Sequence, residues 1–413
     1  MEIDKILCIS LLLVQGFLVW KIVHHRMLRF SILWIIFWLL VACLNLFKSE
    51  FYPSTTVILF LVFTSIVACL GSVSQASLFD NINIENQYDF LAKTSKLAYI
   101  IIIPVMSLLA FKSISLLQTI NIYDFRREVY SSSSGILPAG FLPIYTLLIG
   151  GLYKFSLFTS IYLFINGRGR INLFLPVVTT LLSCVITLGR FPLYEITLIL
   201  MLALYYKRMF NLKILICGVF VFLALITFSI FRSGSYYGLS SIIQRHILGY
   251  HTYGFYLLEH KLTSIDLLND SWLGMASSGS FGYFLTLPIT WVSNFVSYMQ
   301  SSYFLHQDQF VNVGSTFDGT AMYANAFYTL LYEPILDFGY LGVVMIGVLI
   351  GIVFRYFCVQ ESRNVMAGII LLYTSSILIG GIMKSAFIRH DIILPTVLFG
   401  FIFYLFKSKE NLN

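Results

Sequence analysis

Charged residues are scarce in this sequence. Of its 413 residues only 11% are Asp, Glu, Lys or Arg, whereas 58% are hydrophobic and 17% are aromatic. Soluble domains carry about 25% charged residues, and these cover the surface that faces water. A bilayer, by contrast, solvates apolar surface directly. The composition therefore excludes a water-soluble domain and predicts an integral membrane protein.

Cysteine is also scarce, and the patterns that hold metals are missing. The six cysteines all fall in or at the ends of apolar runs: Cys8, Cys43, Cys69, Cys184, Cys217 and Cys358. They form no CxxC pair, so the sequence predicts neither a disulfide framework nor a cysteine metal site. The net charge of +7 is spread along the chain without a basic cluster, which argues against nucleic-acid binding.

Apolar runs of about 20 residues, the length that crosses a bilayer as a helix, recur along the chain. We expect an all-α polytopic membrane protein, a single domain over residues 1–413 with about eleven spans. The predicted spans are 6–23, 30–47, 55–73, 97–117, 141–165, 171–188, 191–206, 212–231, 336–357, 364–383 and 389–406. The first run lacks a small-residue cleavage site, so we expect a retained helix rather than a signal peptide.

Short basic turns predict the orientation of these helices. Lys and Arg concentrate in cytoplasmic loops. The turns Lys21–Arg29, Gly167–Arg170 and Lys207–Lys213 all reach the same side when the spans are followed in order. We therefore expect the N-terminus outside, the C-terminus inside, and residues 232–335 in one long external loop.

The long segment 232–335 is polar and aromatic but contains few charges. Polar residues recur at helical spacing over Tyr283–Met299, which predicts an uncharged amphipathic helix at the membrane surface. Ala321–Tyr332 is predicted as a second short helix, and the Gly-rich stretch Gly274–Gly282 as a binding surface or a hinge. The Tyr and Trp side chains of the segment suit either a membrane interface or stacking on sugar rings.

Four cations lie at the predicted outer ends of different helices. They are Arg190, Arg232, Lys384 and Arg389. Arginine binds phosphate oxygens through paired hydrogen bonds, so the set predicts a site for a lipid diphosphate. Alternatively, each one extends to anionic headgroups, as basic residues at helix ends commonly do. Positive residues are normally depleted at outer helix ends, which favours the diphosphate interpretation for the set.

Three further candidates are charged residues within predicted spans or at their mouths. Glu195 lies one turn into its span, where an acid without a partner is costly, so we expect a functional or structural ion pair. Lys154 lies near the middle of its span with no acid at the same predicted depth; either it marks a polar cavity or the span boundary is wrong. Asp337, at the outer mouth of a span, is either a general base for a sugar hydroxyl or a helix cap.

The histidines of the long segment are scattered and lack the spacing of a metal site. His251 follows Arg245 closely and lies between Tyr250 and Tyr253, which makes it the best candidate for a general base among them. Arg389-His390-Asp391 forms a compact cluster at the start of the last predicted span. This cluster either positions an acceptor or ends a loop.

Four short stretches stand at the predicted outer ends of spans or within the long loop. They are Leu188-Gly189-Arg190-Phe191, Phe231-Arg232, Asn325-Ala326-Phe327 and Asp337-Phe338-Gly339-Tyr340-Leu341-Gly342. The chain resembles the O-antigen polymerase (Wzy-type) family of oligosaccharide repeat-unit polymerases. The resemblance lies in these stretches, in the number of spans and in the position of the long loop. The resemblance covers most of the chain and implies a GT-C-like helical membrane fold.

The resemblance implies a glycosyltransferase of the bacterial cytoplasmic (inner) membrane that acts on its outer side. It would transfer a growing glycan from undecaprenyl diphosphate to the acceptor sugar of a new lipid-linked repeat unit. No metal or nucleotide-sugar cofactor is implied, which fits the lack of a DxD-like motif or a phosphate-binding Gly-rich loop on the predicted inside segments. The implied partners are the undecaprenyl-diphosphate-linked oligosaccharide, membrane lipid, a chain-length-determining co-polymerase and a flippase.

Roles for individual residues follow from this reaction. We expect Arg190 and Arg232 to hold the diphosphate, with Arg389 or Arg245 assisting. His251 or Asp337 is expected to contact the acceptor hydroxyl. The remaining predicted substrate-binding residues are Lys384, His390, Asn325 and Glu195.

Two other classes stay open. An O-antigen ligase has a similar layout of helices and external loop. A lipid-linked oligosaccharide flippase or polysaccharide transporter commonly shows internal repeats and charges at the bilayer midplane. The sequence shows no convincing repeat, and only Lys154 favours the transporter.

Overall fold

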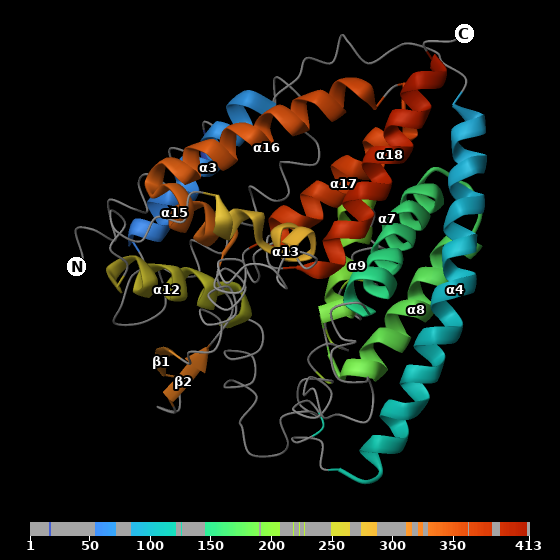
Figure 1. The fold of residues 1–413 in the computed structure, drawn as a ribbon, viewed down its shortest axis with the longest axis horizontal. Coiled ribbons are helices and arrows are strands. Elements are labelled where there is room, and N and C mark those ends of the chain that lie inside the picture. Colours follow the sequence, from blue (N-terminus) through green and yellow to red (C-terminus); the bar gives the residue numbers. More distant parts are fainter. Residues whose placement is uncertain are drawn as a thin grey trace. The chain divides into compact units, whose positions relative to one another are not determined.

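The computed structural model describes residues 16–17, 54–71, 84–120, 125, 145–189, 191–206, 218, 223, 227, 249–264, 274–286, 311–315, 321–324, 329–361, 363–381 and 389–410. The chain divides into two compact units. Unit 1 comprises Met1–Ser77, Ser235–Val359 and Ile377–Arg389, and unit 2 comprises Leu78–Gly234, Gln360–Ser376 and His390–Asn413. Figure 1 shows the helices and strands of both units.

Helices dominate the described residues, as the sequence predicts. Three are long and apolar enough to cross a membrane by length and composition: α4 (Glu85–Leu117), the continuous η2 and α7 (Thr146–Gly150 and Gly151–Ile165), and α16 (Tyr340–Gln360). Shorter apolar helices are α3 (Ser54–Gly71), α8 (Ile171–Thr187), α9 (Phe191–Tyr206), α17 (Val365–Gly380) and α18 (Ile393–Glu410). Each overlaps a predicted span, which confirms the helical class. The predicted spans 6–23, 30–47 and 212–231 lie almost wholly outside the described residues.

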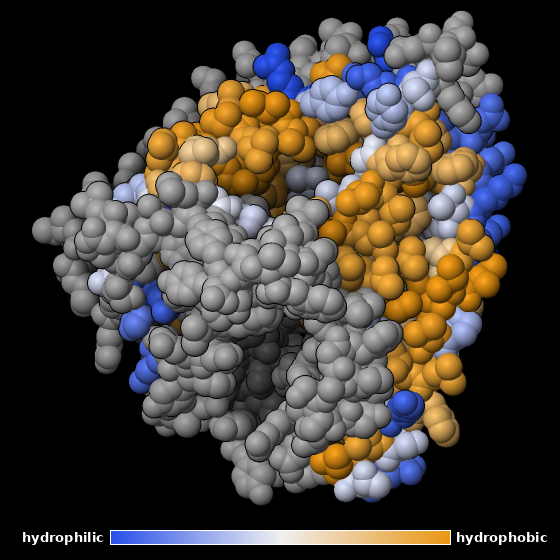
Figure 2. All heavy atoms as spheres, viewed as in Figure 1, coloured by the Kyte–Doolittle hydropathy of each residue, from blue (hydrophilic) through white to orange (hydrophobic). Residues whose placement is uncertain are grey.

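The long helices expose apolar faces. On α4, Ile100, Leu108 and Phe111 are 69%, 68% and 71% exposed, and on α16 Leu341 is 62% exposed. Figure 2 shows apolar side chains over much of the visible surface of the described helices. Soluble proteins rarely expose contiguous apolar patches of this kind. These faces are therefore suited to contact with lipid.

Helix α7 is the centre of unit 2 and is buried along nearly its whole length. It packs against α4, α8, α9 and α18. Pairs of hydroxyl groups join it to two of these helices, Ser160 to Ser95 of α4 at 2.6 Å and Tyr153 to Thr180 of α8 at 2.9 Å. Hydrogen bonds between small polar side chains are a common means of joining helices where water is absent.

Unit 1 contains α16 packed closely on α3. A Cβ atom added at Gly347 would lie 3.2 Å from a methyl carbon of Ile66, and one at Gly351 would lie 2.8 Å from Cβ of Leu70. Small residues four positions apart on one helix face allow two backbones to approach in this way. The glycines of α16 therefore form a contact surface for α3.

Parts of the long polar segment also belong to unit 1. They are α12 (Gly249–Ser264), α13 (Met275–Thr286) and an antiparallel hairpin of β1 (Val311–Ser315) and β2 (Ala321–Ala324). Helix α12 is buried over much of its length and packs on α3, where the rings of Phe255 and Phe60 lie 4.7 Å apart between centroids. The predicted external segment is thus structured in the parts that are described.

Two predictions of local structure differ from what is observed. Helix α4 begins at Glu85 rather than at residue 97, because its first turns bury Tyr88, Leu91 and Ser95 at helical spacing while Asp89, Lys93 and Lys96 add charges around them. That amphipathic extension is too polar to be recognised as part of a span. The predicted helix Ala321–Tyr332 is wrong: its first residues form β2, where pairing with β1 overrides local helix propensity. Helix α15 (Tyr332–Phe338) begins only at the end of that range.

The two remaining predictions for the long segment concern α13. Of the predicted amphipathic helix Tyr283–Met299, only the first four positions lie within the described residues, where they end α13. The Gly-rich stretch Gly274–Gly282 is largely helical, but it is kinked at Gly279, where φ is 45° and ψ is −125°. Glycine adopts this conformation readily because it has no Cβ. The sequence predicts either a binding surface or a hinge for Gly274–Gly282, and the structure shows a kink within this stretch.

Candidate functional site

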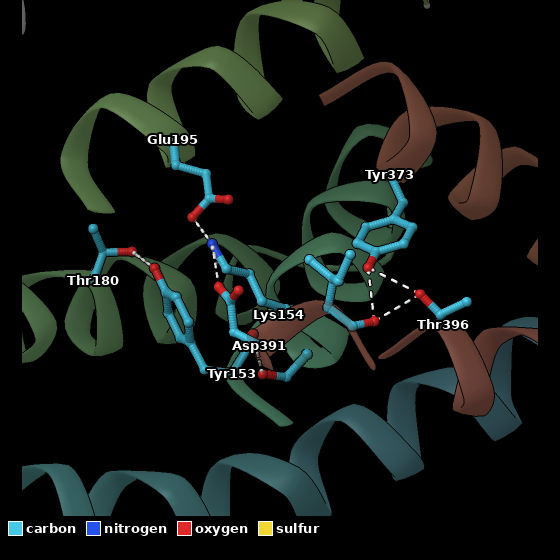
Figure 3. Close-up of polar contacts among 9 residues, drawn as sticks. Tyr153, Lys154, Thr180, Glu195, Tyr373, Asp391 and Thr396 are labelled. Carbon is cyan, nitrogen blue, oxygen red and sulfur yellow. Dashed lines mark hydrogen bonds and ion pairs between the residues drawn. The ribbon is translucent and has the colours of Figure 1, made fainter. Parts of the chain in front are cut away.

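Unit 2 contains a cluster of three charged side chains, two of them buried. Lys154 of α7 donates a hydrogen bond from its ammonium group to Oε2 of Glu195 on α9. Oδ2 of Asp391, in the short helix η4 (His390–Ile392) that leads into α18, lies 3.7 Å from the same ammonium nitrogen. Figure 3 shows the Lys154 ammonium between the two carboxylates. One lysine thus joins the beginnings of two other helices to α7.

Two adjacent glycines allow the chain to bring Asp391 to Lys154. A Cβ at Gly150 would lie 3.3 Å from Cβ of Asp391, and one at Gly151 would lie 2.6 Å from Cβ of Leu394. Contacts of the second length are essentially never made by real Cβ atoms, so a side chain at Gly151 would push α18 away from α7. The junction of η2 and α7 is therefore shaped to receive η4.

Aromatic and hydroxyl groups surround the cluster. The ammonium nitrogen of Lys154 lies 5.6 Å from the ring centre of Tyr153 and 5.9 Å from that of Phe191, the first residue of α9. The negative faces of such rings attract a cation. On α17, the hydroxyl of Tyr373 donates to the carbonyl oxygen of Ile392 at 3.1 Å, which fixes the start of α18 beside the cluster (Figure 3).

Burial makes the pairing of these charges necessary. The side chains of Lys154 and Glu195 are 5% and 6% exposed, whereas that of Asp391 is 24% exposed. Removing one partner of a buried ion pair typically costs about 3–5 kcal/mol, because the other charge is left without compensation. The cluster is therefore held as a unit, with Asp391 as its most accessible member.

Glu195 is part of an ion pair, as the sequence analysis allowed, but the prediction for Lys154 is wrong on one point. Lys154 does have acids at its own depth. Lys154 is the fourth residue of α7, which continues from η2 without a break. Glu195 and Asp391 are likewise near the starts of α9 and α18. The structure therefore gives Lys154 two acidic neighbours that the predicted depths did not.

The turn between α8 and α9 is strained. Leu188, which ends α8, has φ of 45° and ψ of 33°, the left-handed conformation. For a residue with a Cβ this conformation costs about 1–2 kcal/mol, and such strain concentrates at functional sites. Arg190 follows two positions later and directly precedes Phe191 in the sequence. Its own position lies outside the described residues.

The other predicted site residues are described to different extents. Arg232, Arg245, Asn325 and Lys384 lie outside the described residues. His251 falls in α12 and His390 in η4, although neither side chain is among those described. Arg389 is buried, with 8% exposure. The structure therefore brings together Glu195 with Lys154 and Asp391, and it does not describe the predicted set of outer cations as a group.

Asp337 lies in α15 of unit 1 and is 1% exposed. Its Oδ1 accepts a hydrogen bond from the backbone N–H of Ala276 at 2.9 Å, and its Oδ2 accepts one from that of Ser277 at 2.6 Å. Both donors are in the first turn of α13. Of the two predicted roles, the contacts match that of a helix cap, and the helix that is capped is α13.

Sequence reasoning missed Glu259 entirely. This residue of α12 is 7% exposed and accepts hydrogen bonds from the backbone N–H of Thr55 at 3.3 Å and of Thr56 at 2.7 Å, at the start of α3. The hydroxyl of Thr56 adds a third hydrogen bond at 2.8 Å. Capping motifs are recognised from neighbours in sequence, and these partners are 203 or more positions apart. No local pattern could have paired them.

Among the described residues no group of three or more His, Cys, Asp and Glu side chains is arranged to hold a metal ion. The described helices have the length and composition of a polytopic helical membrane protein, with one buried ion-pair cluster in unit 2. Compared with family models, curated proteins and solved structures, the chain gives no match.

Proposed function

We propose that this chain is a membrane glycosyltransferase that polymerises lipid-linked oligosaccharide repeat units on the outer face of the bacterial cytoplasmic membrane. The observation that best supports the proposal is the cluster of Lys154, Glu195 and Asp391. It ties down the starts of α9 and α18, the two helices that begin just after Arg190 and Arg389 in the sequence. A protein that uses these arginines at a fixed site needs such helix starts to be held firmly.

The donor substrate in this proposal is a glycan linked to undecaprenyl diphosphate. Arg190 and Arg232 bind the diphosphate, with Arg245, Lys384 and Arg389 as further cations. When the bond between the anomeric carbon and the phosphate oxygen breaks, negative charge develops on that oxygen. Each fixed donor that meets this charge typically contributes about 3 kcal/mol. Glu195 supports this side of the reaction through Lys154, without contacting the glycan.

The acceptor is the terminal sugar of a second lipid-linked repeat unit. Its hydroxyl oxygen forms the new bond to the anomeric carbon, the hydroxyl proton passes to a base, and undecaprenyl diphosphate leaves. His251 is the base in this proposal, and Asn325 and His390 orient the acceptor. Orientation of two reacting groups can lower a barrier by several kcal/mol.

Deletion of the chain in its host, followed by separation of surface glycans by size, tests the class. Loss of a repeat-unit polymerase converts a ladder of polymer lengths into a single repeat unit on the surface. Loss of a ligase leaves polymer on its lipid carrier instead, and loss of a flippase leaves no surface glycan. An unchanged ladder contradicts all three.

Substitutions test the donor site within that class. Arg190→Ala and Arg232→Ala are expected to abolish polymer while the protein remains in the membrane. Arg168→Ala is the matched control, because Arg168 is a partly exposed arginine in the turn after α7 whose carboxylate partner is Glu85. Polymer of normal length in both of the first two variants would refute the diphosphate assignment.

One observation favours a second function, a flippase or transporter of lipid-linked oligosaccharide. Charged residues buried within membrane helices commonly mark substrate or proton pathways, and the cluster at Lys154 is of this kind. A flippase predicts that Lys154→Met blocks delivery of any glycan to the outer surface. The polymerase predicts that single repeat units still reach the surface in the same variant.

A further inference from the structure

The stretch Asp337-Phe338-Gly339-Tyr340-Leu341-Gly342 forms a joint between α15 and α16. Gly339 has φ of 59° and ψ of −150°, which ends α15, and its N–H donates to the carbonyl oxygen of Ile335 at 2.8 Å. A Cβ at Gly342 would collide with the carbonyl oxygen of Pro334. Glycine at this position therefore lets α15 fold back against the first turn of α16.

The same joint holds the start of α13. The carboxylate of Asp337 accepts the N–H groups of Ala276 and Ser277, which have no acceptor within their own helix. A ring carbon of Phe338 lies 3.8 Å from the position that a Cβ at Gly274 would take, just before α13. Because the start of a helix has a partial positive charge, a carboxylate there is favourable. Asp337 thus links a predicted membrane span to a helix of the long polar segment.

The contacts leave no room for a sugar hydroxyl at Asp337. Both carboxylate oxygens are engaged by backbone amides, and the residue is 1% exposed. A substrate would have to displace the start of α13 to reach either oxygen. By contrast, α13 itself exposes hydroxyl and aromatic side chains, the types that can contact a sugar: Ser277 and Ser278 are partly exposed, and Phe281 is 37% exposed.

We propose that α13 is an acceptor-binding surface for the glycan and that Asp337 is a positioning residue that holds this helix in place. The role of Asp337 is to accept hydrogen bonds, and removal of a proton from the acceptor falls to another group. This inference rests on the proposed polymerase function for the identity of the ligand. The cap itself does not depend on that function.

Substitutions at Asp337 separate positioning from base catalysis. Asparagine can still accept one of the two hydrogen bonds but cannot act as a base, whereas alanine can do neither. For a positioning residue, Asp337→Ala raises the KM for the lipid-linked acceptor by at least about tenfold, since hydrogen bonds to a charged group are lost. Asp337→Asn shows a smaller rise, and kcat keeps its dependence on pH in both variants. An equal loss of kcat in both would overturn the proposal.

A proline in α13 tests the cap from the other side. Ala276→Pro removes the N–H that donates to Oδ1 of Asp337 and leaves the carboxylate in place, at a helical position that tolerates proline. The expected rise in KM resembles that of Asp337→Asn, and the double variant is no worse than either single variant. Additive effects would show that Asp337 acts independently of α13.

Hydrogen exchange of the full-length protein separates failure of this inference from failure of the proposed function. The amides of Ala276 and Ser277 should exchange at least about tenfold faster in Asp337→Ala than in the unaltered chain. Unchanged exchange would overturn the cap whatever the activity. If exchange changes as expected but the unaltered chain does not lengthen any lipid-linked glycan, the cap stands and the polymerase proposal fails.

Discussion

Units 1 and 2 both bury carboxylates, but they supply different partners for them. In unit 2, Glu195 and Asp391 meet the ammonium group of Lys154. In unit 1, Glu259 and Asp337 accept backbone N–H groups at the starts of α3 and α13. For these two carboxylates no ion pair is found within the described ranges of the chain.

The difference decides which side chains can be replaced. A helix start is equivalent to about half a positive charge, and its N–H groups require only an acceptor. A buried ammonium group is a full charge that requires a negative partner. Neutral amides should therefore substitute for the carboxylates of unit 1 with small effect, whereas no neutral residue should substitute for one member of the unit 2 cluster.

The largest expected effect is that of Lys154→Met. Both carboxylates would lose their ammonium partner, and we expect a loss of about 3–5 kcal/mol in the free energy of unfolding. Thermal unfolding of the detergent-purified protein measures this. Lys96→Met is the control, because Lys96 is exposed on α4 and its loss should change stability by less than about 0.5 kcal/mol. Equal melting temperatures for the two variants would remove the distinction between the units.

Exchanging the charges of Lys154 and Glu195 tests the same difference between the two units. In Lys154→Glu with Glu195→Lys, the pair is restored in reverse, but Glu at 154 now lies beside Asp391, which is 3.7 Å from the ammonium in the native arrangement. We expect the double variant to remain unstable and to improve when Asp391→Asn is added. Full recovery in the double variant alone would show that Asp391 is not a member of the cluster.

A smaller effect is expected in unit 1. Glu259→Ala removes the acceptor for three donors and should lower stability by about 1–3 kcal/mol, whereas Glu259→Gln should lower it by about 1 kcal/mol or less. Thermal unfolding again measures both, with the exposed Thr263→Ala of the same helix as control. If Gln is as harmful as Ala, the negative charge itself is needed and the two units do not differ.

The smallest effect is expected at the surface of unit 2. Arg168 donates to Glu85 at 2.6 Å, but the Glu85 side chain is 64% exposed and the pair is screened by salt. Arg168→Gln should leave the melting temperature unchanged within error at moderate salt. A clear loss of stability would mean that this exposed ion pair contributes as much to the free energy of unfolding as the buried cluster does.

The sequence was sufficient for the approximate positions of most apolar helices, because span length and hydrophobicity are local properties. Helix α9 begins and ends where the apolar pattern predicts, and α8 differs by one residue at its end. The sequence predicted that Glu195 forms an ion pair or has a functional role, since an acid in a span requires a partner. Its partner Lys154 was not identified, because the two residues are 41 positions apart in the sequence and meet only through the packing of α7 on α9.

Capping across long distances could not be predicted in the same way. Asp337 binds amides 60 and 61 positions away, and Glu259 binds amides more than 200 positions away. Nothing in the neighbouring residues marks these partners, since they depend on how α12 packs on α3 and how α13 packs on α15. The hairpin of β1 and β2 was missed for the same reason, because strand pairing is decided by a partner rather than by propensity.

Reconstitution of the purified full-length protein with two labelled, undecaprenyl-diphosphate-linked repeat units tests the central proposal most directly. The measurement compares the length of the glycan products with the amount of undecaprenyl diphosphate released. We predict one released lipid diphosphate for each new glycosidic bond, and neither product in Arg190→Ala, whereas Arg168→Ala behaves as the unaltered chain. Glycans that remain single repeat units, with no lipid diphosphate released, would contradict the proposed function.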